Sequence, residues 1–323
     1  MEERQEIDII LATYNGEKYL KCQLDSILNQ TYKNIRILIN DDASTDGTAD
    51  ILKEYEQKDN RIQVQYNEKN LGYIKNFENL LNRVKSKYFM LSDQDDYWKQ
   101  DKVEKSLNKI IEDDADLVFT DLEAVDENLN IITPSVVDFR GFKKNIEIHS
   151  DYKLVSLHNC AVTGCTIITK KELIHKYVPI PEKEPMVHDW WMALMIGQDG
   201  KISFLDESTI KYRQHGNNQI GIYGMKNEIK TAEEYRNRYI QLKLDQFNVY
   251  IENEDKFTNK EIPNLAKRGT VYMTDIKQKK VINFKNYKTF FDLYNMENGM
   301  MRLKTFVMLN LPIVAKFTYK IFK

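Results

Sequence analysis

Apolar residues in the first 120 positions of the chain follow two alternating patterns. Short continuous apolar runs have the length of strands that are buried on both faces of a parallel sheet. Between these runs, apolar residues recur every three or four positions, which is the spacing of an amphipathic helix. The predicted strands are residues 7–12, 35–39, 62–66, 88–91 and 117–120, and helices are predicted between them, among them residues 74–84 and 99–111. This order predicts an α/β fold in which helices flank a mostly parallel, Rossmann-like sheet.

After residue 121 the pattern becomes less regular. Two further strands and one short buried helix are predicted there, at residues 166–169, 202–205 and 190–196. From about residue 225 the sequence is helical, polar and rich in tyrosine, which indicates a change of structural unit. The predicted division is a main domain at residues 1–225, with halves 1–121 and 122–225, and a helical C-terminal extension at residues 226–323.

The last 23 residues of the chain have a composition of their own. Five of them are basic and none is acidic, and the basic residues stand among apolar ones at Arg302, Lys304, Lys316, Lys320 and Lys323. This composition is typical of a basic amphipathic tail that lies on an anionic membrane surface. The alternative is a terminal helix that packs on the domain or on a second subunit.

Composition and charge exclude several classes of protein. The chain has 323 residues, of which 42% are hydrophobic and 30% charged, so it is globular rather than disordered or collagen-like. Its 47 basic and 49 acidic residues give a net charge of −2, which argues against a nucleic-acid partner. Three scattered cysteines provide neither a disulfide framework nor paired zinc ligands, as expected in a reducing cytoplasm. The N-terminal residues 1–6 are charged and lack the apolar stretch of a signal peptide. The chain also contains no run of 18 or more apolar residues, the length that a membrane-spanning helix needs.

An acidic cluster of Asp93, Asp95 and Asp96 directly follows the predicted strand at residues 88–91. Alternate side chains of an extended segment point the same way, so Asp93 and Asp95 can converge on one point. Carboxylate oxygens suit Mg²⁺ or Mn²⁺, and such a cation would relieve the repulsion between the acids. A solvated acidic turn is the alternative for an isolated triplet. Ligands of open α/β sheets bind at the carboxyl ends of strands, however, and this position favours a cation site.

Polar groups also follow the first and second predicted strands. Thr13, Tyr14 and Asn15 end the first strand, and the polar segment 40–48 follows the second. A purely structural turn, with Asp46 capping a helix, is the alternative for the second segment. The chain contains neither of the glycine-rich phosphate-binding motifs GxxxxGK[ST] and GxGxxG, so a metal would have to hold any phosphate groups.

Taken together, residues 10–20, 38–48 and 91–98 resemble the family 2 glycosyltransferases, enzymes of the GT-A fold. They are most similar to the bacterial rhamnosyltransferase-like members that build cell-surface polysaccharides. The resemblance continues in the same order through residues 163–166, 187–191 and 212–218. It covers about residues 7–222 and adds little for the rest of the chain.

The resemblance implies roles for the residues at the three strand ends. Asp93 and Asp95 would form the DxD motif, with Asp95 the more direct ligand of a divalent metal that bridges the donor diphosphate and Asp96 in support. The residues implied to surround the base and ribose of the donor are Thr13, Tyr14, Asn15, Asp41 and Asp42. Ala43 stands where the family usually has glycine, and we expect it to restrict this turn to negative φ.

The resemblance also places Asp189 as the catalytic base, at the start of the helix predicted at residues 190–196. A helix cap is the alternative for an isolated acid there. An inverting transfer needs a carboxylate that takes the proton of the acceptor hydroxyl, and an ordinary Asp can do so. His215 would approach the metal or the diphosphate, and Arg213 would add positive charge to the donor site. Gly164 would pass under the sugar, and Trp190 could stack on it or pack in the core.

The expected function is a metal-dependent, inverting transfer of a sugar from a nucleoside diphosphate to a hydroxyl of a growing, lipid-linked surface glycan. The specific donor expected is TDP-rhamnose, with a UDP-hexose as the alternative. A sugar nucleotidyltransferase would need a glycine-rich basic loop near its start, and a non-catalytic sugar-binding scaffold would be expected to lack Asp95 or Asp189. We expect the tail to hold the enzyme on the cytoplasmic face of the cell membrane. A homodimer through the extension is the alternative.

Overall fold

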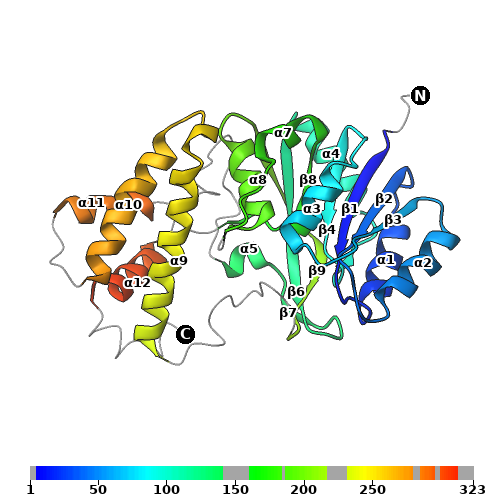
Figure 1. Cartoon of the computed structure of the whole chain (residues 1–323), viewed down its shortest axis with the longest axis horizontal. Helices are drawn as coiled ribbons and strands as arrows, with labels where there is room; N and C mark the ends of the chain where they lie inside the picture. The colour runs from blue at the N-terminus through cyan, green and yellow to red at the C-terminus, as the bar shows by residue number, and fades with distance from the viewer. Residues whose placement is uncertain are drawn as a thin grey trace.

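The computed structural model describes residues 5–140, 160–183, 186–216, 231–278, 284–294 and 299–311. Figure 1 shows two regions side by side, an α/β region that extends to residue 216 and a group of helices that follows residue 231. One cluster of buried apolar residues runs through both regions, from Phe77 and Trp191 to Phe247 and Tyr272. The two regions therefore share part of their core.

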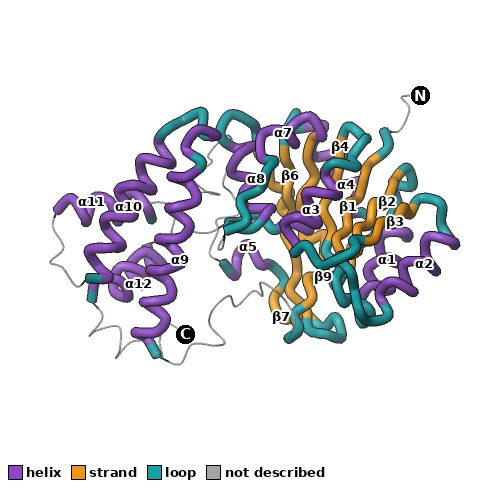
Figure 2. Tube along the Cα trace, viewed as in Figure 1, coloured by secondary structure: helices purple, strands orange, loops and turns teal. Residues whose placement is uncertain are grey.

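Within the described ranges, nine strands form a single sheet (Figure 2) in the order β3-β2-β1-β4-β8-β6-β9-β5, with β7 paired to β6. The strands are β1 (Ile7–Thr13), β2 (Ile35–Asp41), β3 (Ile62–Tyr66), β4 (Tyr88–Ser92), β5 (Tyr97–Trp98), β6 (Leu117–Val125), β7 (Ile131–Thr133), β8 (Ile167–Lys170) and β9 (Ile202–Arg213). Strands β1 to β4 are mutually parallel, and β8 is antiparallel to its neighbours β4 and β6. The mostly parallel sheet predicted from the apolar runs is confirmed.

Helices cover both faces of this sheet. The helices of the α/β region are α1 (Leu20–Leu28), α2 (Thr48–Lys58), α3 (Tyr73–Leu81), α4 (Lys102–Glu112), α5 (Val136–Phe139), α7 (Ile174–Tyr177) and α8 (His188–Gly197). Successive residues of a strand face opposite sides. Accordingly, Ile7, Ile9 and Leu11 of β1 pack in the cluster with α1, α2 and α4, whereas Ile10 packs in the cluster with α3 and α8. Burial on both faces explains the continuous apolar run at residues 7–12.

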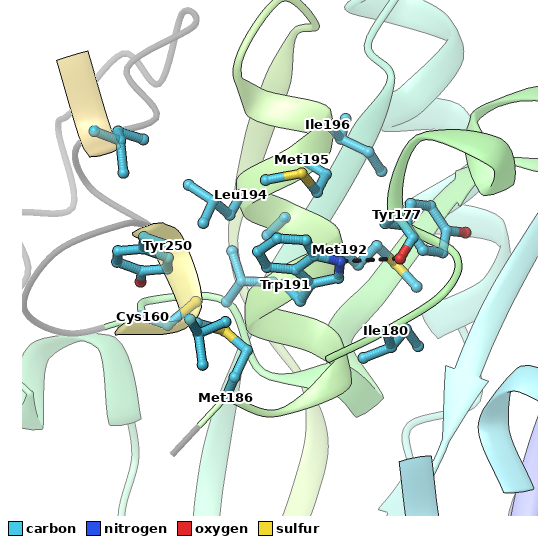
Figure 3. Packing of buried hydrophobic residues seen from close by; sticks show 14 of the residues in the cluster. Cys160, Tyr177, Ile180, Met186, Trp191, Met192, Leu194, Met195, Ile196 and Tyr250 are labelled. Atoms are coloured by element: carbon cyan, nitrogen blue, oxygen red, sulfur yellow. Dashed lines mark hydrogen bonds between the residues drawn. The ribbon is translucent and has the colours of Figure 1, made fainter. Parts of the chain in front are cut away.

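In the described part of the second region the α-helices are α9 (Ala232–Glu252), α10 (Glu261–Lys277), α11 (Phe284–Leu293) and α12 (Gly299–Asn310). The buried Arg236 connects α9 to α10 and α12, because its guanidinium donates hydrogen bonds to the backbone oxygens of Ile276 and Leu309. Around Trp191 the two regions meet (Figure 3): Trp191 Nε1 donates to Tyr177 O at 2.9 Å, and Tyr250 of α9 lies in the same cluster. No helix in the described ranges is both long and apolar enough to span a bilayer.

Two strands are much longer than predicted. β6 ends at Val125 rather than at residue 120, and β9 ends at Arg213 rather than at residue 205. The β9 extension is largely polar, and the β6 extension alternates the acids Asp121 and Glu123 with buried apolar residues. The two extensions pair with each other, with Glu123 opposite Lys211 and Val125 opposite Arg213. Polar residues interrupt both extensions, so neither carries a continuous apolar run that would reveal it as a strand.

The expectation for Ala43 was wrong. This residue has a positive φ of 58°, the left-handed conformation that glycine adopts more easily. Left-handed backbone disfavours alanine by about 1–2 kcal/mol. Hydrogen bonds on either side hold the turn, since Asp41 accepts from the backbone N–H and hydroxyl of Ser44, and Asp42 accepts from the backbone N–H groups of Leu71 and Gly72.

Candidate active site

The ends of β1, β2 and β4 lie at one edge of the sheet because these strands are parallel and in register. Thr13 stands opposite Asp41, and its hydroxyl donates to the Asp41 carboxylate at 2.8 Å. Leu11 stands opposite Ser92, so the acidic loop that follows β4 begins at the same level. The sheet thus brings together the three polar segments that sequence analysis selected.

The acids after β2 are buried and engaged within the protein. Asp41 and Asp42 are each 2% exposed. Besides Leu71 and Gly72, the Asp42 carboxylate accepts from the side chain of Asn67 at 2.8 Å. These acids therefore shape the loops that enter α2 and α3. Tyr14, by contrast, is 46% exposed beside them. Contact of Thr13, Asn15 and the neighbouring residues with a nucleotide stays a prediction.

The acids of the acidic loop separate into two groups. Ligand atoms of Asp93, Asp96 and Cys165 lie within 4.8 Å of one another. Asp95 instead pairs with His215, whose Nε2 lies 2.8 Å from Asp95 Oδ2. Burial, and then the charges of Asp95 and Asp189, raise the pKa of Asp93 to about 7. Burial, and then the charges of Asp95 and Asp93, also raise the pKa of Asp96 well above its usual range.

These residues fit a divalent cation. Asp96 is fully buried, and its Oδ2 has no hydrogen-bond partner among the described residues. Such crowded carboxylates would be stabilised by a positive ion. Carboxylate oxygens suit Mn²⁺ or Mg²⁺, and the neighbouring Asp93 and Asp96 would hold it. Participation of Asp95 and His215 as ligands stays a prediction. Burial, and then the charges of Asp96 and Asp93, raise the pKa of the Cys165 thiol well above its usual range.

Arg213 braces the acidic loop in this structure. It is 3% exposed, and its guanidinium donates to the backbone oxygens of Asp95 and Glu127, while its backbone N–H donates to Asp96 Oδ1. The ring of Tyr19, which precedes α1, lies 4.6 Å from the Arg213 guanidinium and stacks on His215 with a centroid distance of 4.9 Å. Contact of Arg213 with a donor diphosphate stays a prediction.

Asp189 lies in the first turn of α8, and its charge reaches the acidic loop, where it raises the pKa of Asp93. The backbone N–H of Gly164 donates to Asp189 Oδ2 at 2.6 Å, and that of Trp190 donates to Oδ1 at 2.7 Å. A Cβ on Gly164 would lie 3.3 Å from Asp189 Oδ2 and 3.2 Å from His188 Nε2, so a glycine permits this close approach.

Trp190 faces the extension. Its Nε1 is buried without a hydrogen-bond partner in the described ranges, and its ring lies 5.8 Å from the Lys243 ammonium of α9. The ring of the neighbouring Trp191 is fully buried, as expected for a packing residue. Stacking of Trp190 on a sugar stays a prediction.

Four residues near these acids were not predicted from the sequence as site residues. Gln94 reaches the backbone of Tyr14, Tyr19 stacks on His215, and Cys165 lies among the acids. Lys102 is completely buried with its ammonium 4.7 Å from the Trp98 ring, and burial lowers the pKa of Lys102 to about 7. Of these four residues, only Gln94 could have been selected from the sequence, because it stands between the two candidate metal ligands Asp93 and Asp95. A lysine at the start of a helix is ordinarily exposed.

A family model described as "Glycosyl transferase family 2" matches residues 8–177. The dTDP-rhamnosyl transferase RfbG of Shigella flexneri is 28% identical over 265 residues, which cover 78% of this chain and 88% of that protein.

Two solved structures share the fold. The structure of S. aureus TarS 1-349 in complex with UDP-GlcNAc superposes with a TM-score of 0.59 at 16% identity, covering 98% of this chain and 91% of that one. The mannosyltransferase PcManGT from Pyrobaculum calidifontis, in complex with GDP-Man and Mn2+, gives a TM-score of 0.57 at 13% identity, covering 98% and 81% of the two chains. At these identities the two likenesses concern the fold.

Proposed function

The chain belongs to glycosyl transferase family 2 and is a glycosyltransferase, and from this premise we propose that it is a metal-dependent, inverting enzyme that uses a nucleoside diphosphate sugar. One observation carries the proposal: Cys165 lies within 4.8 Å of the Asp93 and Asp96 carboxylates, and the backbone N–H of the preceding Gly164 donates to Asp189 Oδ2 at 2.6 Å. A cation ligand set and a candidate base are therefore neighbours, as sugar transfer from a diphosphate requires.

The protein's own residues would act on the acceptor side of this reaction. The acceptor oxygen forms a bond to the anomeric carbon while the bond from that carbon to the diphosphate breaks, and the acceptor proton passes to Asp189. Two backbone N–H groups fix the Asp189 carboxylate, so it needs no rearrangement to receive the proton. A bound Mg²⁺ or Mn²⁺ would stabilise the charge that develops on the leaving diphosphate.

The proposed donor is TDP-rhamnose. The full-domain relationship to the dTDP-rhamnosyl transferase RfbG supports it. UDP-hexoses remain the alternative donor, because the neighbouring fold of TarS was solved with UDP-GlcNAc. For the acceptor we propose a hydroxyl of a lipid-linked surface glycan. The division at residue 225, with donor and acceptor halves before it, is part of the same proposal.

We further propose that the tail holds the enzyme on the cytoplasmic face of the membrane. Its first part is α12, where Leu303 is 58% exposed next to Lys304. Residues 312–323, which carry three of the five basic residues, lie outside the described residues. A homodimer through α10 to α12 is the second candidate, because Val271 and Phe291 are also more than half exposed.

Isothermal titration calorimetry with TDP, UDP and GDP, with Mn²⁺ and with a chelator, tests the proposal. We expect one nucleotide to bind in a Mn²⁺-dependent manner and Asp95→Ala to abolish that dependence, because Asp95 would be the most direct ligand. Asp101→Ala is the matched control, since Asp101 lies outside the acidic loop with its side chain 44% exposed. The metal would have no part in the mechanism if the chelator left the nucleotide affinity of the native protein unchanged. The same would follow if Asp95→Ala bound the nucleotide with the native Mn²⁺ dependence.

A further inference from the structure

Gln94 connects the acidic loop to the loop after β1. Its side-chain oxygen accepts from the backbone N–H of Tyr14 at 2.9 Å, and its side-chain nitrogen donates to the backbone oxygen of Tyr14 at 3.0 Å. Gln94 stands between Asp93 and Asp95, 80 positions from Tyr14 in the sequence. Both polar atoms of its carboxamide are engaged by one residue, so its contribution here is to join two loops.

The loop after β1 has two kinds of anchor. Asn15 and Gly16 bond to the segment after β2: Asn15 N–H donates to Ser44 Oγ at 2.9 Å, and Gly16 N–H donates to Thr48 Oγ1 at 2.8 Å. The Gln94 bonds reach in the other direction, to the segment after β4. A Cβ on Gly16 would lie 2.3 Å from Gln94 Oε1, so the bare backbone at position 16 makes room for the carboxamide.

We propose that Gln94 is a positioning residue that holds the loop at residues 13–15 and the acidic loop at residues 93–96 in register. This inference rests on the proposed function, in which the first loop receives the nucleoside and the second binds the metal and the diphosphate. The two loops would form two half-sites of one donor site, one for the nucleoside and one for the metal and the diphosphate. A ligand that spans both half-sites binds with the full affinity of both contacts only when the distance between them is fixed before binding. Gln94 fixes the distance between the two loops through hydrogen bonds to the Tyr14 backbone, so this distance does not depend on the Tyr14 side chain.

The test compares ligands that occupy one half-site with a ligand that spans both. In the full-length protein, calorimetry measures the affinity for Mn²⁺ alone, for the metal-free nucleoside monophosphate and for the nucleoside diphosphate with Mn²⁺. For Gln94→Leu we expect the first two affinities to stay within about twofold and the third to fall about tenfold, the effect of losing two backbone hydrogen bonds. Gln57→Leu, an exposed position on α2, is the matched control.

Gly16→Ala provides a second perturbation of the same contact, because the added methyl group displaces the Gln94 carboxamide. We expect it to reproduce the Gln94→Leu pattern and to add nothing further in a Gln94→Leu background. Equal losses for the monophosphate and the diphosphate would overturn the inference, since Gln94 would then only shape the nucleoside pocket. Unchanged affinities would overturn it as well. Absence of Mn²⁺-dependent binding in the native protein would overturn the proposed function, and this inference with it.

Discussion

At the scale of single residues, the hydrogen bonds of Asp189 determine which substitution can test its proposed role as the catalytic base. Gly164 N–H and Trp190 N–H each donate to one of its carboxylate oxygens. Asn keeps the size of the side chain and one acceptor oxygen but cannot take up a proton. Asp189→Asn should therefore keep the fold and the nucleotide affinity while turnover falls at least about a hundredfold.

A radiolabel or coupled nucleotide-release assay measures turnover, and calorimetry measures the affinity. Asp199→Asn, two residues after the end of α8, is the matched control, because its side chain is 47% exposed and pairs with Lys176 on the surface. If turnover falls less than tenfold while nucleotide affinity drops sharply, Asp189 belongs to the donor pocket and the base lies elsewhere.

The second prediction at this scale concerns pH. Burial and neighbouring acids raise the pKa of Asp93 from 3.8 to about 7, so below pH 7 a proton competes with any cation that this carboxylate binds. Mn²⁺ affinity should fall about tenfold per pH unit between pH 7 and 5. In the metal-free protein the folded state binds this proton more tightly than the unfolded state, so the Asp93 contribution to stability decreases as pH rises from about 4 to about 7.

Mn²⁺ titrations and thermal unfolding across this range measure both effects. Asp93→Asn should weaken the pH dependence of metal-free unfolding, because it removes one of the two carboxyl groups in the acidic loop whose pKa is raised. A Mn²⁺ affinity that is constant from pH 5 to pH 8 would show that Asp93 is not a ligand.

At the scale of elements, burial decided what the sequence could predict. β1, β2 and β4 are covered on both faces, so their apolar runs showed both their positions and the edge at which the acids gather. The extensions of β6 and β9, where polar residues interrupt the apolar ones, had no such continuous run. For the same reason, Asp93, Asp95 and Asp189 could be selected as acids after strands or at a helix start. The contacts of Gln94 with Tyr14, and the burial of Lys102, depend on tertiary packing that no local pattern encodes.

Asp8 shows how the opposite end of β1 is fixed. It is completely buried, and its carboxylate accepts from the Arg36 guanidinium through two bonds of 2.8 Å and from the backbone N–H groups of Lys85 and Ser86. Asp8→Ala removes one partner of a largely buried ion pair and leaves two amides unpaired. We expect the free energy of unfolding to fall by about 3–5 kcal/mol.

Urea unfolding followed by circular dichroism measures this loss as a shift of the midpoint at constant m-value. Asp50→Ala on α2 is the control, because that carboxylate is 88% exposed and its substitution should change stability by less than about 0.5 kcal/mol. A midpoint for Asp8→Ala that matches the control would mean that β1 does not depend on this ion pair.

At the scale of the whole molecule, the helices after residue 231 determine how the tail can be tested. α12 is integrated into this group: Leu309 is fully buried, its backbone oxygen accepts from Arg236, and the Asn310 side chain accepts from the Tyr272 hydroxyl. Removal of the chain from residue 299 would therefore strip packing from α9 and α10. Truncation after Leu311 leaves these contacts intact and removes Lys316, Lys320 and Lys323.

We expect the 1–311 chain to keep its thermal unfolding midpoint and its nucleotide affinity but to lose binding to anionic vesicles. Each basic residue near an anionic surface contributes about 1 kcal/mol, so three of them correspond to about a hundredfold in affinity. Cosedimentation with anionic and with neutral vesicles at low and at high salt measures the loss, which salt should reproduce in the full-length protein.

Two comparisons separate the membrane from a second subunit. Lys316, Lys320 and Lys323 replaced together by Gln should weaken vesicle binding as the truncation does, whereas the same change at the exposed Lys33, Lys53 and Lys69 should have little effect. If the truncated and full-length chains bind vesicles equally, the tail has no membrane role. A mass in analytical ultracentrifugation that falls from dimer to monomer on truncation would then assign residues 312–323 to a subunit interface.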